Sequence, residues 1–184
     1  MTLAKEYRVL AIYAGRFDPA TNGHLDIAIR ASKLFSELLI AVYQLPPERS
    51  LFSTEERVQM MRDSVAGHDN VRVVPFSGLL TDFAERQQAQ VLVRGIRAVT
   101  DFYAEFDQAL MYKRMQPEIE QVYLISDLQH LFISASRIKE VYQLGYDVLE
   151  LVPPPVLTSL QRKFPDALDG AAAPSVVEQT AVRD

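Results

Sequence analysis

The chain contains no cysteine. This absence excludes a disulfide scaffold, a metal site built from thiolates and a cysteine nucleophile, and it is compatible with a reducing compartment. The sequence also lacks an apolar run of membrane-spanning length, and its N-terminus lacks a basic region followed by an apolar stretch and a cleavage site. We therefore expect an unprocessed cytoplasmic protein without a membrane partner.

Two nucleotide-binding motifs are missing as well. The sequence has neither the Walker phosphate loop nor the G-x-G-x-x-G pattern of dinucleotide-binding proteins, which disfavours a kinase or a dehydrogenase. It has no obvious carboxylate cluster, so we predict no protein-held metal and expect any Mg²⁺ to arrive with a nucleotide. The net charge of −5 argues against a nucleic-acid partner, although it leaves room for a small basic cleft.

The composition that is present indicates one globular domain. A chain of 184 residues with 48% hydrophobic and 23% charged side chains can bury a core without disulfides. We expect a single domain over residues 1–165. Residues 166–184 are predicted to be a flexible C-terminal tail, because the stretch from Gly170 to Asp184 is small and polar without periodicity.

Apolar strand-like runs alternate with helix-period segments. The expected strands are 9–14, 38–43, 71–76, 91–93 and 121–125, and the expected helices are 24–35, one from 53, 80–88, 101–115, 134–145 and a segment ending at 164. Ser53 (with Glu56), Asp101 and Ser134 are expected to cap helices, and Pro75 places its strand at or near an edge. The alternation predicts an α/β fold, a Rossmann-like five-stranded parallel sheet with helices on both faces. Such sheets bind ligands at the carboxyl ends of their strands.

The loop after the first strand carries the strongest functional signal. It runs from Gly15 to His24 and joins a buried strand to a helix. Gly15 permits a tight exit from the strand, and His24 falls at a helix start, where backbone N–H groups attract phosphate. An imidazole there can donate to a phosphate oxygen as charge develops. The alternative is a capped loop with an incidental histidine, and the whole ten-residue pattern favours function.

Two further loops add weaker signals. Arg94 and Arg97 flank the end of the fourth strand, and arginine suits phosphate because its donors form a planar fork. Glu105 could contact a nucleotide or hold an arginine, and the alternative is a surface loop in which these arginines pair with Asp101 and Glu105. The run Phe132–Arg137 after the fifth strand carries serines that can cap a helix or bind a phosphate chain.

Together these loops resemble those of the bacterial pantetheine-phosphate adenylyltransferases, within the nucleotidyltransferase superfamily. The resemblance runs in order from about Val9 to Pro153 and includes Phe52 with Glu55-Glu56-Arg57, the run 94–97, Asp101-Phe102, Glu105 and Ile133-Ser134-Ala135-Ser136. It implies adenylyl transfer from ATP to 4'-phosphopantetheine, giving dephospho-coenzyme A and pyrophosphate. The acceptor phosphate would attack the α-phosphorus in line, without a covalent enzyme intermediate, and the subunits would form hexamers.

The resemblance also implies roles for individual residues. His24 would stabilise charge on the transferring phosphoryl group, and Arg97 would join it as a catalytic residue. The implied ATP-binding residues are Arg16, Phe17, His24, Gly95, Ile96, Arg97, Glu105, His130, Leu131, Phe132, Ile133, Ser134, Ala135 and Ser136. The implied acceptor-binding residues are Arg16, Glu48, Leu80 (through its backbone) and Arg94.

Three positions depart from the family pattern, and all lie on the acceptor side. Arg16 stands where the family has threonine, Glu48 where it has lysine and Tyr112 where it commonly has asparagine. Arg16 and Glu48 could pair with each other, and Tyr112 would narrow the acceptor pocket or merely pack. These changes leave two alternatives open: an adenylyltransferase for another phosphorylated small molecule, or a weakly catalytic nucleotide-binding relative. The intact His24 argues against the second, because binding alone needs no histidine there.

Overall fold

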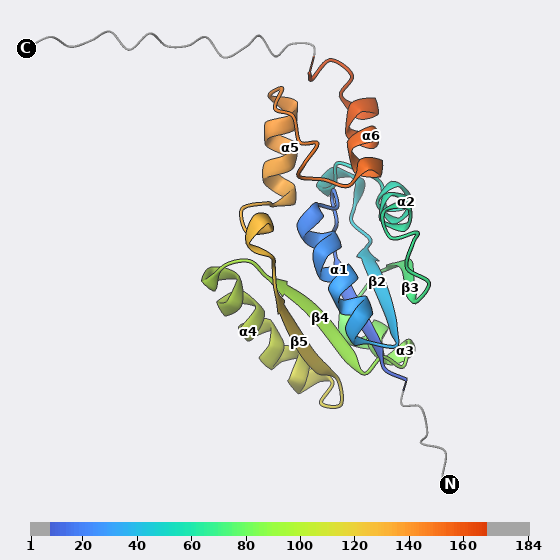
Figure 1. Cartoon of the computed structure of the whole chain (residues 1–184). Helices are drawn as coiled ribbons and strands as arrows, with labels where there is room; N and C mark the ends of the chain where they lie inside the picture. The colour runs from blue at the N-terminus through green and yellow to red at the C-terminus, as the bar shows by residue number, and fades with distance from the viewer. Residues whose placement is uncertain (1–7, 169–184) are drawn as a thin grey trace, which may run out of the picture.

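A five-stranded parallel sheet forms the centre of the molecule (Figure 1). The computed structural model describes residues 8–168, and the strand order is β3-β2-β1-β4-β5. The strands are β1 Leu10–Gly15, β2 Glu37–Tyr43, β3 Val71–Phe76, β4 Val91–Ile96 and β5 Glu120–Ile125, and every neighbouring pair is parallel. The predicted α/β fold is confirmed. Pro75 lies on the outer strand β3, where a residue without an N–H is tolerated.

Within residues 8–168, six α-helices connect and cover the strands. They are α1 Asn22–Leu34, α2 Thr54–Ser64, α3 Leu80–Arg86, α4 Val99–Met115, α5 Ala135–Gln143 and α6 Pro154–Lys163, with short 3₁₀ turns at Pro47–Arg49 and Leu128–His130. Two predicted caps are confirmed. Ser53 and Glu56 form a capping box at the start of α2, and the Ser134 hydroxyl accepts a hydrogen bond from the backbone N–H of Arg137 at 3.3 Å.

The expected cap at Asp101 is wrong. Helix α4 begins at Val99, and its N-cap, Ala98, makes no side-chain cap. The Asp101 carboxylate instead accepts hydrogen bonds from the backbone N–H and the Nε of Arg97, at 3.2 and 3.1 Å. The Asp101 carboxylate is therefore bonded to Arg97, four residues earlier, and does not cap the helix.

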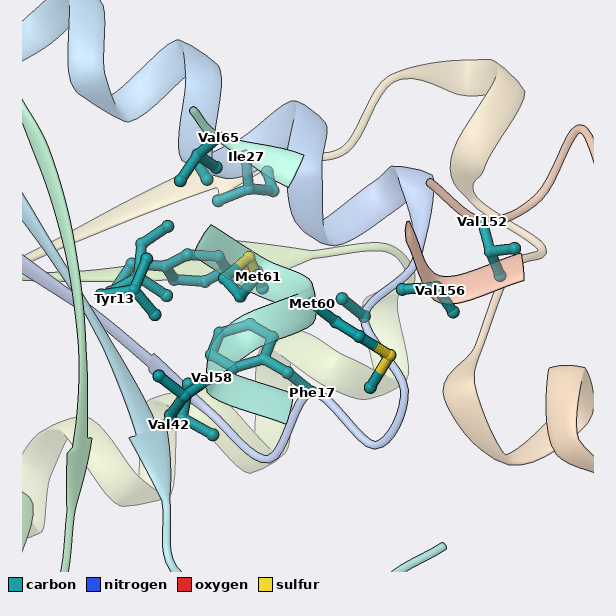
Figure 2. Packing of buried hydrophobic residues seen from close by; sticks show 14 of the residues in the cluster. Tyr13, Phe17, Ile27, Val42, Val58, Met60, Met61, Val65, Val152 and Val156 are labelled. Carbon is teal, nitrogen blue, oxygen red and sulfur yellow. The ribbon is translucent and has the colours of Figure 1, made fainter. Parts of the chain in front are cut away.

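The core lies on both faces of the sheet. On β1, Ala11 and Tyr13 pack into a large cluster with α1, α2, α5 and α6 (Figure 2). The intervening residues Ile12 and Ala14 pack into a second cluster with α3 and with Tyr112 of α4. Because alternate side chains of a strand point to opposite faces, this division confirms helices on both faces.

The strand order reverses between β1 and β4. Chain connections run outward from β1 through β2 to β3, then return to the other side of β1 through β4 to β5. Ligands of open α/β sheets bind at this kind of switch point, beyond the carboxyl ends of the strands. Strand β4 continues to Ile96, past the predicted strand end at Arg94-Gly95, so Arg94 and Gly95 belong to the strand and pair with Tyr123 and Leu124.

Among residues 8–168, no helix has both the length and the apolar character needed to cross a membrane. Most of the predicted tail, residues 169–184, lies outside the described residues. The boundary between residues 165 and 166 stays a prediction.

Candidate active site

A cavity of about 370 Å³ opens at the switch point between β1 and β4. All three sequence motifs contribute to its wall. The lining residues are Tyr13, Ala14, Gly15, Phe17, Thr21, Gly23, His24, Ile27, Arg94, Gly95, Arg97, Asp101, Ala104, Glu105, Ser126, Ile133, Ser134, Ala135 and Ser136. Residues that are more than a hundred positions apart therefore face one space, as the parallel sheet predicts.

The first loop folds tightly under the cavity. Phe17 has a positive φ of 49°, and its ring lies so close to Gly15 that a Cβ there would stand 2.8 Å from the ring. A larger residue at position 15 would displace the Phe17 ring, so this close contact requires glycine. The Phe17 ring packs edge-on against the imidazole of His24, with centroids 5.2 Å apart, and against Tyr13 at 5.4 Å. The strand exit thus holds the imidazole in place.

The backbone fixes the protonation state of His24. His24 is the third residue of α1, and its Nδ1 accepts a hydrogen bond from the backbone N–H of Thr21 at 3.0 Å. Thr21 in turn caps the helix, which completes a capping box. Since Nδ1 is an acceptor, the neutral ring carries its proton on Nε2. Burial, and secondly the charge of Arg97, lower the pKa of His24 to about 4, so near pH 7 the ring offers a neutral donor.

Both arginines of the second motif are held by carboxylates of α4. Glu105 accepts two hydrogen bonds from Arg94, at Nε and Nη2, both 2.6 Å long. Arg97 contacts Asp101 at 3.1 Å and donates from Nη1 to the carbonyl of Ile133 at 3.0 Å. Of the two roles considered for Glu105, the structure shows that it holds an arginine.

The third motif supplies the start of helix α5. Ser134, Ala135 and Ser136 line the cavity, and the bond from Arg97 to Ile133 ties this segment to β4. Helix α5 has nine residues, so its first N–H groups and its dipole favour an anion in front of it. Helix α1 begins at the same cavity. Two helix N-termini and two arginines therefore surround a space of suitable size for a polyphosphate.

Several predicted site residues lie outside this wall. The ring of Phe132 is 69% exposed, and the side chain of Leu80 is buried in the second core cluster. Ile96, His130 and Leu131 also fall outside the cavity lining. Tyr112 packs against the second core cluster and is not among the residues that line this cavity; a narrowing of the acceptor pocket by Tyr112 stays a prediction.

The hypothesis that Arg16 pairs with Glu48 is wrong. Both residues are exposed, and among the described residues no ion pair joins them. Glu48 lies in the 3₁₀ turn after β2, while Arg16 follows the end of β1. Long charged side chains in water lose rotamer freedom on pairing, which offsets most of the attraction.

Several lining residues were not predicted as site residues from the sequence, among them Tyr13, Ala14, Thr21, Ile27, Ala104 and Ser126. Two had a detectable signal. Thr21 stands three residues before His24, the spacing of a capping box, and Ser126 directly follows β5 at a carboxyl end. No sequence pattern indicated Ile27, because its place in the wall depends on a tertiary contact with Gly95. A Cβ added to Gly95 would lie 3.1 Å from the isoleucine Cγ1.

Metal-ligating side chains do not gather in the part of the chain that the structure describes. Residues 8–168 contain no group of three or more His, Asp or Glu side chains placed to hold an ion. The carboxylates of the cavity, Asp101 and Glu105, are engaged by arginines. The expectation that Mg²⁺ arrives with the nucleotide stays a prediction.

The sequence and the fold both have close counterparts among known proteins. The cytidylyltransferase-like family model matches residues 12–141. The chain is 46% identical over 163 residues to the phosphopantetheine adenylyltransferase of Heliobacterium modesticaldum, covering 89% of this chain and 97% of that protein. It is 47% identical to the enzyme of the same name from Lawsonia intracellularis, covering 84% and 90%.

Among solved structures, a bifunctional NMN adenylyltransferase/ADP ribose pyrophosphatase from Francisella tularensis superimposes with a TM-score of 0.63 at 20% identity. The match covers 89% of this chain and 53% of that one, so the chain spans about half of that bifunctional protein. At this identity the likeness concerns the fold alone.

Proposed function

We propose a reaction for this chain from the premise that it belongs to the cytidylyltransferase-like family and, within it, to the phosphopantetheine adenylyltransferases. The chain transfers the adenylyl group of ATP to the phosphate of 4'-phosphopantetheine, giving dephospho-coenzyme A and pyrophosphate. The observation that carries this proposal is the neutral imidazole of His24, held by the backbone between two helix N-termini and two arginines.

The chemical step follows from that geometry. An oxygen of the acceptor phosphate forms a bond to the α-phosphorus, the bond to the β-phosphate oxygen breaks, and pyrophosphate leaves with the electron pair. Negative charge grows on the non-bridging oxygens as the two bonds exchange. The Nε2–H of His24 and the guanidinium of Arg97 donate to these oxygens, so catalysis consists of positioning and charge stabilisation.

The ATP side comprises the residues around the cavity. Phe17 contacts the nucleotide through its backbone, while Gly95 to Arg97 and the segment from His130 to Ser136 surround its ribose and phosphates. Glu105, which the resemblance assigns to ATP, holds Arg94 and so acts on the acceptor side. Magnesium enters bound to the phosphates of ATP, where it supplies charge neutralisation, and no step relies on an ion held by the protein.

The acceptor side comprises Arg16, Arg94, Leu80 and the loop of residues 44–53, which carries Glu48 and which we call the acceptor loop. Arg16 is exposed, stands between the cavity-lining residues Gly15 and Phe17 in the sequence, and has no carboxylate partner among the described residues. It therefore supplies the cation for an anionic acceptor. Leu80 contributes its backbone at the start of α3, since its side chain is buried.

A homo-oligomer, and specifically a hexamer, is the assembly that we propose. Helix α4 exposes an apolar surface to which Tyr103, Phe106, Leu110 and Met111 contribute, each between 49% and 68% exposed. Apolar patches of this kind mark interfaces, and a second copy would cover it. Light scattering of the purified protein tests the mass. The cytoplasmic location and the absence of a nucleic-acid partner stay predictions.

Product analysis tests the reaction directly. Purified protein is incubated with magnesium ATP and phosphopantetheine, and dephospho-coenzyme A and pyrophosphate are measured. His24→Ala is expected to lower turnover by about a hundredfold or more, the size found when one transition-state donor is removed, with a much smaller change in ATP affinity. His68→Ala, outside the cavity, is the matched control. Equal losses of turnover and ATP affinity in His24→Ala would contradict the catalytic role of His24. ATP binding by the wild-type protein without product would point to another acceptor or a non-catalytic relative.

A further inference from the structure

Asp18 is a buried carboxylate that joins three segments of the site. It lies in the first loop, is only 5% exposed, and faces neither the cavity nor bulk water. Its Oδ2 accepts from the backbone N–H of Leu51 at 2.9 Å and from the Nζ of Lys139 at 3.0 Å. Its Oδ1 accepts from the backbone N–H of Phe52 at 3.0 Å. One side chain thus holds the end of the acceptor loop and a lysine of α5.

Lys139 brings the phosphate side of the site into this contact. It stands on α5, whose first residues line the cavity. Its ammonium bonds to Asp18 while its side chain is 30% exposed. Removing the lysine would leave a carboxylate in a dry environment with only its two backbone donors close by, and burying a charge without its partner is costly. The acceptor loop, the first loop and α5 therefore hold their positions jointly.

Arg57 closes the same arrangement from the other side. Its side chain is fully buried and donates to the backbone carbonyls of Arg16 at 2.7 Å, Tyr43 at 2.8 Å and Phe52 at 3.1 Å. These carbonyls belong to the first loop, to the last residue of β2 directly before the acceptor loop, and to the far end of the acceptor loop. With both ends fixed, the remaining freedom of the acceptor loop depends on how firmly Asp18 is itself held.

We propose that Lys139 is a positioning residue for acceptor binding: through Asp18 it fixes the acceptor loop against the first loop. It touches neither substrate, and this inference rests on the proposed function for its kinetic consequence. The variant Lys139→Met keeps the length of the side chain and removes the charge, and since the lysine is partly exposed the protein still folds. Lys139→Arg restores a cation that can reach Asp18.

The test uses two readouts on the full chain. In the first, trypsin cleavage after Arg49, an exposed residue of the acceptor loop, is followed by mass spectrometry of the fragment. We expect Lys139→Met to accelerate this cleavage several-fold. In the second, the KM for phosphopantetheine is expected to rise about tenfold, the order that loss of one charge-assisted hydrogen bond produces, while the KM for ATP stays nearly constant.

Matched variants separate positioning from general destabilisation. Lys113→Met removes a lysine whose partner, Glu120, lies away from the site, and it should change neither readout. Lys139→Arg should restore both. Unchanged cleavage and unchanged acceptor KM in Lys139→Met would overturn the inference, and so would equal changes for both substrates without rescue by arginine. If the wild-type chain forms no product, the proposed function fails, whereas cleavage after Arg49 still decides the inference.

Discussion

The folded protein should resist protonation of His24, and this resistance makes its stability depend on pH in a defined window. Protonation would place a hydrogen on Nδ1, the atom that accepts the backbone N–H of Thr21 at 3.0 Å. It would also add a positive charge near Arg97. Withdrawal from water, with this charge as a second cause, lowers the pKa of His24 from 6.5 to about 4.

The sign of the effect follows from linkage. As the pH falls below 6.5, the unfolded chain binds a proton at this histidine before the folded protein does. The stabilisation is therefore fully present above pH 6.5 and is lost as the pH falls from 6.5 to about 4. The difference between the two pKa values, at about 1.4 kcal/mol per pH unit, corresponds to about 3 kcal/mol at most. Because the ring is partly open to the cavity, we expect roughly 2 kcal/mol between pH 7 and pH 4.5.

A variant without a titratable side chain at position 24 isolates this contribution to stability. His24→Gln keeps the capping box, since glutamine is a usual partner at the third helical position, but it has no proton to bind. Urea unfolding followed by circular dichroism at pH 7, 6, 5 and 4.5 gives the free energy of unfolding for both proteins. Carboxylates titrate alike in the two and cancel in the difference, and His68→Gln controls for loss of any histidine. Parallel pH profiles for wild type and His24→Gln would refute the reasoning.

Three other variants probe different parts of the molecule. Arg57→Met leaves three backbone carbonyls without their buried donor and should lower the free energy of unfolding by about 3 kcal/mol or more, measured in urea; a loss below about 1 kcal/mol would mean that water replaces the guanidinium. Glu105→Gln weakens the hold on Arg94 and should raise the KM of the acceptor with little loss of thermal stability, and unchanged kinetics would show that the pair does not orient the arginine. Arg16→Thr combined with Glu48→Lys should lower the KM for phosphopantetheine by up to about fivefold, the size of one exposed charge pair, because lysine at position 48 removes an anion and replaces the cation lost at position 16, whereas a rise would show that this lysine cannot replace the Arg16 guanidinium.

The sequence was sufficient to predict the fold and to bring the motifs together. Strands rich in apolar residues alternate with helical segments, and the carboxyl ends of parallel strands meet at one edge. The sequence alone therefore predicts that the loops after β1, β4 and β5 surround one site. The cavity lined by His24, Arg97 and Ser134 confirms this prediction. The helix cap at Ser134 could also be predicted from the sequence, since it depends only on neighbouring residues.

The errors and omissions concern polar and charged side chains that have more than one possible partner. Asp101 has the sequence position of a helix cap, but the Arg97 side chain folds back to it. Arg57 follows two glutamates at the start of a helix and would pass for a solvent-exposed residue, yet it is wholly buried against loops from other parts of the chain. Arg16 and Glu48 are opposite charges on neighbouring loops, but sequence does not define where exposed side chains point. The burial of Arg57 and the directions of Arg16 and Glu48 depend on tertiary contacts that no local pattern contains, whereas the Arg97–Asp101 pair is a local contact that the sequence offered as an alternative.

The charge balance of the cavity explains how an acidic protein can hold a polyphosphate. Arg94 and Arg97 each have a carboxylate partner, and His24 is neutral near pH 7, so the wall carries little net positive charge. The wall instead provides hydrogen-bond donors in fixed orientations. Glu105 grips Arg94 through Nε and Nη2, which fixes the plane of the guanidinium, while Nη2 of Arg97 has no protein partner within residues 8–168. Donors oriented in advance need no reorganisation when charge develops during the reaction, and this is the larger part of electrostatic catalysis. The carboxylates thus reduce the net charge of the site while making its remaining donors more effective.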